Sequence, residues 1–89
     1  MEKNIKLVMA KNKDIHIFLN NEDVHTISHD NRKILANDIF TLLNHSIGDI
    51  YNVNTENDTN VDTQVLEFFA ALLKDITAKI QNIRIDEEQ

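Results

Sequence analysis

The spacing of hydrophobic residues changes once along this chain, and the change falls near Ser28. Before it, apolar and polar residues roughly alternate in three short runs rich in β-branched side chains, Ile5–Met9, Ile15–Leu19 and Val24–Ile27. After it, apolar residues recur every three or four positions. Alternation is typical of half-buried strands, and a three-to-four spacing is typical of amphipathic helices. The sequence therefore predicts an N-terminal sheet followed by helices, which is an α+β arrangement.

Two polar segments separate the three runs, Lys11–Asp14 and Asn20–Asp23, and both have the composition of turns. Asparagine tolerates a positive φ, so it can take the place of glycine in such turns. We therefore expect an antiparallel meander with one buried face. The expected buried face carries Ile5, Leu7, Met9, Ile15, Ile17 and Leu19, and the expected outward side chains include Lys6, His16 and His25.

A first helix is expected over about Leu35–Ile47, where apolar residues cover one side of a helical wheel. Ser28 or Asp30 can cap its start, because their side chains accept hydrogen bonds from helical N–H groups. Gly48 is the only glycine of the chain and follows the last apolar residue. Helices often end in a residue with positive φ, so Gly48 is predicted to end this helix. Whether Ile50–Val53 then forms a short fourth strand is left open.

A second helix is expected over about Val61–Ile83. Thr59–Asp62 has the form of a capping box, with a hydroxyl first and a carboxylate three residues later. The helix would be about 34 Å long at about 1.5 Å per residue, whereas a compact domain of this size has a radius of gyration of about 12 Å. Its far end therefore needs cover, either from the strands of the same chain or from the same helix of a second copy.

The complete expected order is βββα(β)α, with both helices covering one face of the sheet. No repeat, low-complexity block or shift in composition marks a domain boundary, so the 89 residues form one small domain over 1–89. The acidic tail 85–89 is expected to be frayed.

The charge is unevenly distributed along the chain. The formal net charge of −6 is the sum of +1 over residues 1–33, with six basic and five acidic residues, and −7 over residues 34–89, with three basic and ten acidic residues. Nucleic-acid binding needs clustered lysine and arginine, so we expect no direct contact with nucleic acid. No apolar run reaches the roughly 18 residues of a membrane span, and the N-terminus does not have the apolar core of a signal peptide. We therefore expect a cytoplasmic protein without membrane contact.

Catalytic and cofactor motifs are absent from the sequence. One glycine and no cysteine leave no phosphate-binding loop, dinucleotide fingerprint, thiolate nucleophile or cysteine-based metal site. Ser28, His29 and Asp30 are adjacent, but consecutive residues of a turn point in different directions and do not make a triad. We therefore expect no enzyme activity, no catalytic residue, no cofactor and no small-molecule substrate.

Two weak metal patterns can also be recognised. His16 and His25 could meet across neighbouring strands on the exposed sheet face and bind zinc or nickel, although ordinary surface histidines are the more common outcome. Asp58–Asp62 resembles the start of a calcium loop, but Thr63 stands where glycine is needed and Phe69 where the bidentate carboxylate is needed. We therefore expect no metal site.

Two hypotheses about function follow. The first is a non-catalytic protein-interaction module that forms a two-fold dimer through the second helix. The apolar stripe is wide for so short a chain, and Phe68 and Phe69 lie about 100° apart on the helix, so one can face the core and the other a partner. The expected interface consists of Phe68, Leu72, Ile76, Ile80 and Ile83.

The second hypothesis is an acidic inhibitor or regulator that occupies the basic surface of a nucleic-acid-binding partner, with carboxylates imitating phosphates. Its expected face consists of Asp49, Glu56, Asp58, Asp62, Glu67 and the C-terminal acids. Salt separates the two hypotheses, because an electrostatic complex weakens as ionic strength rises and an apolar interface does not.

Overall fold

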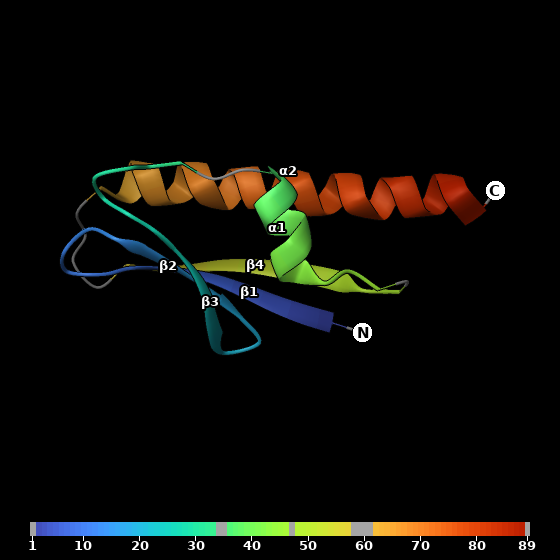
Figure 1. The fold of residues 1–89 in the computed structure, drawn as a ribbon, viewed down its shortest axis with the longest axis horizontal. Coiled ribbons are helices and arrows are strands. Elements are labelled where there is room, and N and C mark those ends of the chain that lie inside the picture. The colour runs from blue at the N-terminus through green and yellow to red at the C-terminus, as the bar shows by residue number, and fades with distance from the viewer. Residues whose placement is uncertain (1, 34–35, 47, 58–61, 89) are drawn as a thin grey trace.

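Four strands form one sheet, and two helices cover one of its faces, in a computed structural model of the chain (Figure 1). The domain is elongated, measuring 45 × 22 × 19 Å, with its long axis along the second helix. The α+β class and the predicted element order are confirmed. The backbone is described over residues 2–33, 36–46, 48–57 and 62–88, and side chains over the same ranges up to residue 80, apart from residue 36.

The sheet combines the predicted meander with one parallel strand. Its strands are β1 (Glu2–Met9), β2 (Ile15–Leu19), β3 (Glu22–Ile27) and β4 (Ile50–Asn57), in the spatial order β3-β2-β1-β4. β1, β2 and β3 are antiparallel neighbours, whereas β4 runs parallel to β1. The fourth strand that the sequence left open therefore forms, and it has eight residues.

The helices cover the sheet face that the alternating pattern predicted to be buried. Directly opposed residues of neighbouring strands share a face, and the opposed residues Leu7 and Ile17 are both buried. Lys6 and Phe18 are opposed on the other face, where the ammonium lies 5.7 Å from the ring centre. The core comprises Ile5, Leu7, Met9, Ile15, Ile17, Ile27, Ile39, Leu43, Leu66, Phe69, Ala70, Leu73 and Ile80.

The first helix, α1 (Ala36–Leu43), is shorter than the predicted span. It ends because Asn44 takes the left-handed conformation, with φ 46°. The Lys3 ammonium donates hydrogen bonds to the carbonyl oxygens of Leu43 and Asn44 at 2.8 and 3.0 Å. A left-handed asparagine and a cation at the carboxyl end both stabilise a helix terminus. The left-handed Asn44 and the Lys3 ammonium therefore end α1 without a glycine.

The prediction that Gly48 ends this helix was wrong. Gly48, with φ 94°, lies in the turn that leads into β4, where the Ser46 carbonyl oxygen accepts the Asp49 N–H at 3.1 Å. The glycine thus sets the direction of β4 instead of the end of α1. Leu35 and Ile47, at the two predicted ends of the helix, lie outside the described residues.

The prediction that His25 points outward was also wrong. The register of β2 and β3 shifts between Ile17 and Phe18, so that Val24 forms a bulge and His25 pairs with Ile17. The bulge breaks the alternation of the strand, so Val24 and the following His25 both lie on the face of the buried Ile17. His25 therefore lies on the helix-covered side, where it borders α1 at Asp38.

The second helix, α2 (Thr63–Glu88), has 26 residues and lies above β1 and β4. Asp62 precedes it with φ 54°, and its carbonyl oxygen accepts the N–H groups three and four residues on. The predicted capping box involves Thr59, which lies outside the described residues. At about 1.5 Å per residue α2 is about 39 Å long, so it is longer than the strands beneath it (Figure 1). Within the described part of the chain, no helix has the length and apolar character that crossing a membrane requires.

Candidate interaction surfaces

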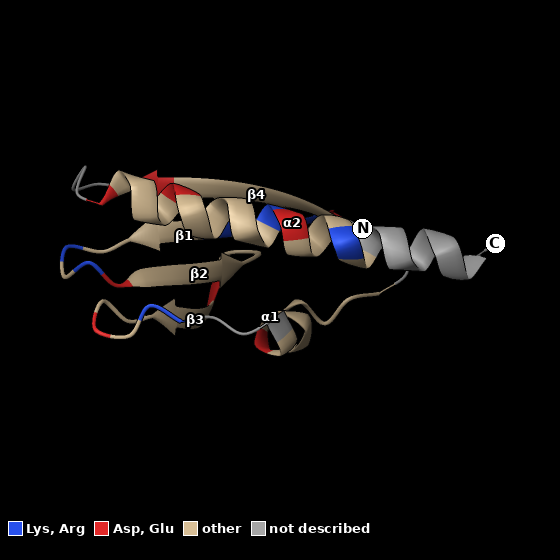
Figure 2. Ribbon diagram, turned by 90° about the horizontal axis from the view of Figure 1, so that it is seen from above, with Lys and Arg blue, Asp and Glu red and all other residues tan. Residues whose placement is uncertain are grey.

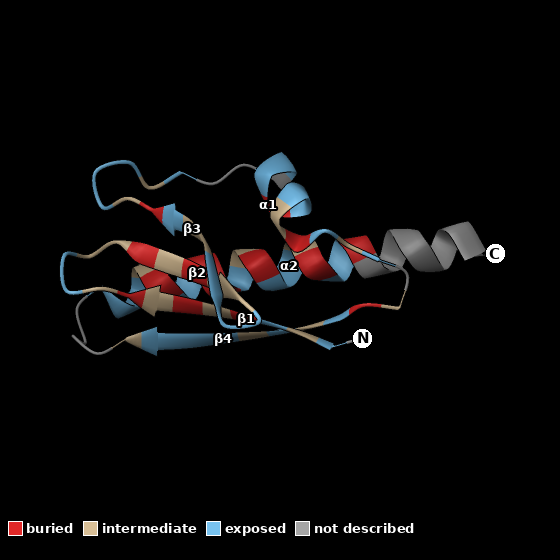
Figure 3. Cartoon of the chain, turned by 60° about the horizontal axis from the view of Figure 1, so that its bottom comes forward, coloured by how far each residue is buried: buried red, intermediate tan, exposed pale blue. Residues whose placement is uncertain are grey.

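α2 packs on the sheet through a narrow stripe and leaves two flanks of different character. The stripe includes Leu66, Phe69, Leu73, Thr77 and Ile80, all buried. These positions are three or four apart, and a helix turns about 100° per residue, so they fall on one side. The alternating bands of buried and exposed residues along α2 are visible in Figure 3. Residues on either side of the stripe border solvent and are the candidates for binding.

The first flank is apolar and comprises Phe68, Leu72 and Ile76. Phe68 is 63% exposed, the largest exposed fraction among the large hydrophobic residues described, and its ring packs edge-on against Phe69 at a centroid distance of 5.4 Å. Leu72 and Ile76 are half-buried and pack against the core from the same side. The two phenylalanines thus divide as the sequence suggested, with Phe69 in the core and Phe68 outside. We call these three residues the apolar flank.

The other two residues of the predicted interface lie elsewhere. Ile80 is 4% exposed and belongs to the core of its own chain. It therefore contributes no free surface to the apolar flank. The side chain of Ile83 lies outside the described residues.

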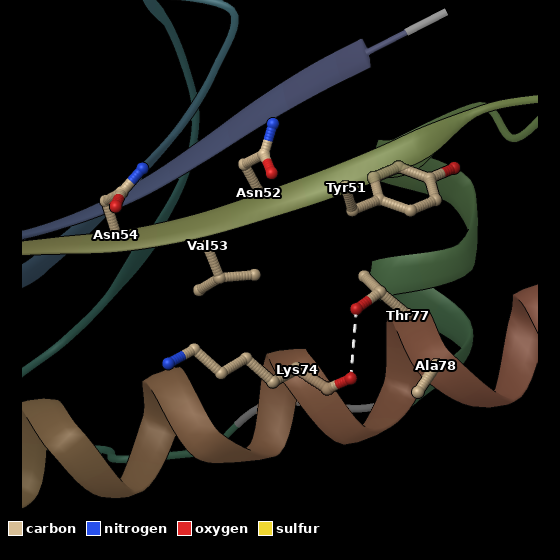
Figure 4. Close-up of a pocket in the computed structure, with 7 residues that line it drawn as sticks. All are labelled: Tyr51, Asn52, Val53, Asn54, Lys74, Thr77 and Ala78. Atoms are coloured by element: carbon tan, nitrogen blue, oxygen red, sulfur yellow. Dashed lines mark hydrogen bonds between the residues drawn. The ribbon is translucent and has the colours of Figure 1, made fainter.

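The second flank of α2 faces the free edge of β4 and is polar. Between them lies a groove with a volume of about 370 Å³ (Figure 4). Its lining consists of Tyr51, Asn52, Val53, Asn54, Lys74, Thr77 and Ala78. We call it the β4 groove. The sequence analysis missed this surface because it exists only where β4 and α2 come together. The one local sign of it is that small or polar residues, Lys74, Thr77 and Ala78, follow one side of α2 at helical spacing.

A polar cluster fixes the end of β4 that enters this groove. The Asp49 carboxylate is buried, accepts the Ser46 N–H at 2.8 Å and lies 3.0 Å from the Lys3 ammonium. Next to it, His45 Nδ1 lies 2.6 Å from the Tyr51 hydroxyl. Since Lys3 also caps α1, this cluster joins the start of β1, the end of α1 and the start of β4. It was not predicted, because Lys3 is separated from the other members of the cluster by more than 40 residues of sequence.

Two acid–base groups of the cluster are shifted. The backbone N–H of Ser46, and after it the hydrogen bond from Lys3, stabilise the carboxylate and lower the pKa of Asp49 below its ordinary value of 3.8. Burial, and secondarily the negative charge of Asp49, raise the pKa of Tyr51 to about 12. Asp49 is therefore ionised and Tyr51 neutral throughout the physiological range, as a structural ion pair and a structural hydrogen bond require.

The carboxylates predicted for an acidic face are dispersed. Asp49 is buried beside Lys3, and the Asp62 carboxylate lies 3.9 Å from the cationic groups of Lys13 and Arg32. In Figure 2 the acidic positions lie on several elements and alternate with basic ones. Of the predicted face, Glu56 and Glu67 are exposed, and Asp58 lies outside the described residues.

The histidines do not assemble a metal site where the sequence suggested one. His16 Nδ1 lies 3.1 Å from the Asp23 carboxylate and 3.1 Å from the Thr26 hydroxyl, on the open face of the sheet. The bulge of β3 places His25 on the opposite face, so the two histidines cannot bind the same metal ion. No group of three metal-ligating side chains occurs within residues 2–33, 36–46, 48–57 and 62–80.

The adjacent Ser28, His29 and Asp30 form a turn. The Ser28 hydroxyl accepts the Asp30 N–H at 3.2 Å, and the His29 N–H donates to the Asp14 carboxylate at 2.8 Å. These contacts fasten the segment after β3 to the turn before β2. Ser28 therefore does not cap α1 as predicted, because α1 begins eight residues later, at Ala36.

A scan against protein-family models, a search of curated proteins and a search of solved structures each found no match to this chain. Its function is therefore inferred from the two flanks of α2 themselves.

Proposed function

We propose that this protein is a non-catalytic, cytoplasmic interaction module that self-associates as a two-fold dimer through the apolar flank of α2. The observation that carries the proposal is the 63% exposure of Phe68 beside two half-buried aliphatic residues. An isolated exposed apolar residue is ordinary, but an aromatic side chain continuous with the core is typical of an interface.

A helix flank of this kind suits two-fold association. In an antiparallel pair of helices the same residues meet from both sides, so Phe68 of one copy can fill the space beside Leu72 and Ile76 of the other. Complete burial of a phenylalanine side chain contributes about 1.5 to 3 kcal/mol, and a two-fold interface contains two of them. Aromatic anchors of this type usually supply most of the binding free energy.

The test is the mass in solution, measured by light scattering coupled to size exclusion at low and high salt. We expect a mass of twice the 10.3 kDa chain at every salt concentration. Phe68→Asp should yield a folded monomer, because Phe68 is exposed within the monomer and its replacement leaves the core intact. Thr63→Asp is the matched control, since it adds the same charge at an exposed position of α2 about 140° around the helix from Phe68 and should leave the dimer unchanged.

A mass of one chain at every salt concentration contradicts the proposal. Association that disappears as salt rises also contradicts it, and favours the acidic alternative instead. In that alternative the exposed Glu56 and Glu67 would contact a basic partner. The structure lends that alternative less support, because Asp49 and Asp62 already face cations of their own chain.

A further inference from the structure

One edge of the sheet is open in a way that native sheets usually avoid. Within the described residues β4 pairs with β1 alone, so its second edge presents backbone N–H and C=O groups to the β4 groove. Edge strands are normally protected by proline, bulges or charged side chains. β3, at the other edge, has the bulge at Val24 and the acidic residues Glu22 and Asp23. Over Ile50–Thr55, β4 keeps an unbroken register with β1 and has no proline or charge.

A cation without a partner lies beside this open edge. Lys74 is exposed and, among the described residues, forms no ion pair, because the positions three and four away from it are alanine or threonine. Lys79 provides the contrast, since Asp75 lies four residues before it and the two side chains pair at 3.0 Å. In Figure 4 the Lys74 side chain extends along the groove below Val53.

The remaining lining leaves room for a main chain. Thr77 and Ala78 are short, and the Thr77 hydroxyl donates to the Lys74 carbonyl oxygen of its own helix at 3.0 Å. Short side chains permit an approaching backbone to reach the hydrogen-bonding groups of β4. Strand addition to a sheet edge uses this combination, in which main-chain hydrogen bonds give affinity and neighbouring side chains give specificity.

We propose that the β4 groove binds an extended segment of a partner protein as a fifth strand, and that a carboxylate side chain of this segment pairs with Lys74. The inference goes beyond self-association, because it uses the opposite flank of α2 from Phe68. The segment has an aspartate or glutamate on its helix-facing side and no proline among the residues that pair with β4.

A second copy of this chain is the less suitable occupant. A two-fold axis between two β4 edges would bring the two grooves, and with them two unpaired Lys74 ammonium groups, against each other. Like charges that face each other are destabilising, whereas a carboxylate complements the ammonium. A second isologous contact in addition to the apolar flank would also extend the dimer into a tetramer or an open chain.

The test begins with a random decapeptide library displayed on phage and selected on the wild-type protein and, in parallel, on Lys74→Glu. We expect the wild-type pool to be enriched in one acidic position and depleted in proline, and the Lys74→Glu pool to carry a basic residue at that position. For a selected peptide, glutamine in place of the acid should weaken binding about two- to fivefold, the range of an exposed ion pair. The fluorescence of Tyr51, the single tyrosine of a chain without tryptophan, reports occupancy of the groove.

Backbone chemistry distinguishes strand addition from other modes of binding. Every second N–H of an added strand points at β4, so N-methylation of that set should weaken binding more than about tenfold, while N-methylation of the other set should leave it intact. Equal binding of both N-methylated sets overturns the proposal. So do pools of equal composition on the two proteins, and peptides that bind without changing Tyr51 fluorescence or the β4 amide resonances. A library that yields no enriched peptide on folded wild-type protein also overturns it.

The Phe68→Asp variant separates this result from the proposed dimer. It should bind the selected peptide with wild-type affinity, because Phe68 lies on the other side of the buried stripe. A failed dimer with intact peptide binding, or the reverse, therefore identifies which of the two proposals is wrong.

Discussion

The two flanks of α2 present different chemistry to solvent although they belong to one helix. The apolar flank offers side chains, with Phe68 exposed beside Leu72 and Ile76. The flank toward β4 offers short side chains and one ammonium, at Ala78 and Lys74, and so leaves the main chain of the strand accessible. The first suits packing against another helix, and the second suits hydrogen bonding to another strand. The difference shows that the strand beneath a helix, and not the helix alone, decides what each flank can bind.

The largest expected effect comes from the buried stripe that separates the flanks. Leu73→Ala removes a side chain that is 1% exposed and should lower the free energy of unfolding by about 2 to 5 kcal/mol, as measured by urea denaturation. Leu72→Ala should cost clearly less, because Leu72 is half-buried. If the two substitutions cost the same, the apolar flank is part of the core and the distinction between stripe and flank fails.

Acid should weaken the β4 side of the domain. The pKa of Asp49 is lowered in the folded state from 3.8, so the unfolded chain binds its proton first as pH falls. The stability that Asp49 contributes is therefore present above about pH 4 and is lost as pH falls through the folded pKa. Asp49→Asn should be less stable at neutral pH, and its unfolding free energy should change less between pH 4 and pH 2, as measured by urea unfolding. An unchanged pH profile would show that the ion pair with Lys3 is not formed in solution.

The pKa of Tyr51 can be measured directly, and it reports on the same end of the β4 groove. The Tyr51 phenol should ionise at a pKa of about 12 in the folded protein and near 10.0 in urea, as followed by phenolate absorbance. Because the folded pKa is the higher one, the stabilising contribution is complete below pH 10 and is lost as pH rises toward 12. Asp49→Asn should lower the folded pKa, since the aspartate charge adds to the effect of burial. A folded value near 10 would place Tyr51 in solvent and open the groove at that end.

The smallest effect is expected at the solvent-exposed border of the apolar flank, on the side of α2 away from the β4 groove. Asp75 and Lys79 form an exposed pair four residues apart. Lys79→Ala should cost at most about 0.5 kcal/mol and only at low salt, and it should alter neither self-association nor peptide binding. If Lys79→Ala weakens self-association or peptide binding, Lys79 itself belongs to the corresponding binding surface.

Local patterns predicted much of the fold. Alternation identified the buried face of β1 and β2, and the three-to-four spacing identified the buried stripe of α2, because both patterns follow from the geometry of a single element. The same patterns failed at His25 and Gly48. At His25 a bulge shifted the register, and at the end of α1 the distant Lys3 together with Asn44 replaced the glycine cap.

The candidate sites were predicted only in part, for a related reason. Phe68 could be identified because two adjacent phenylalanines cannot both face the core. Ile80 has the same spacing and hydrophobicity as the predicted interface residues, yet it is buried in the core of its own chain. No sequence pattern distinguishes a covered apolar residue from a free one when the covering surface comes from another part of the chain.

Local sequence patterns specify the three strands of the meander, the two helices and most of the faces that they bury, since these depend on residues only a few positions apart. The sequence also determined the absence of thiol chemistry and of glycine-rich phosphate loops, since a chain with no cysteine and one glycine cannot build them. Tertiary structure decided that β4 joins β1 in parallel, that Asp49 pairs with Lys3, and that Lys74 borders an open strand edge. Each of these joins parts of the chain at least 20 residues apart, and only the packed chain brings such parts together.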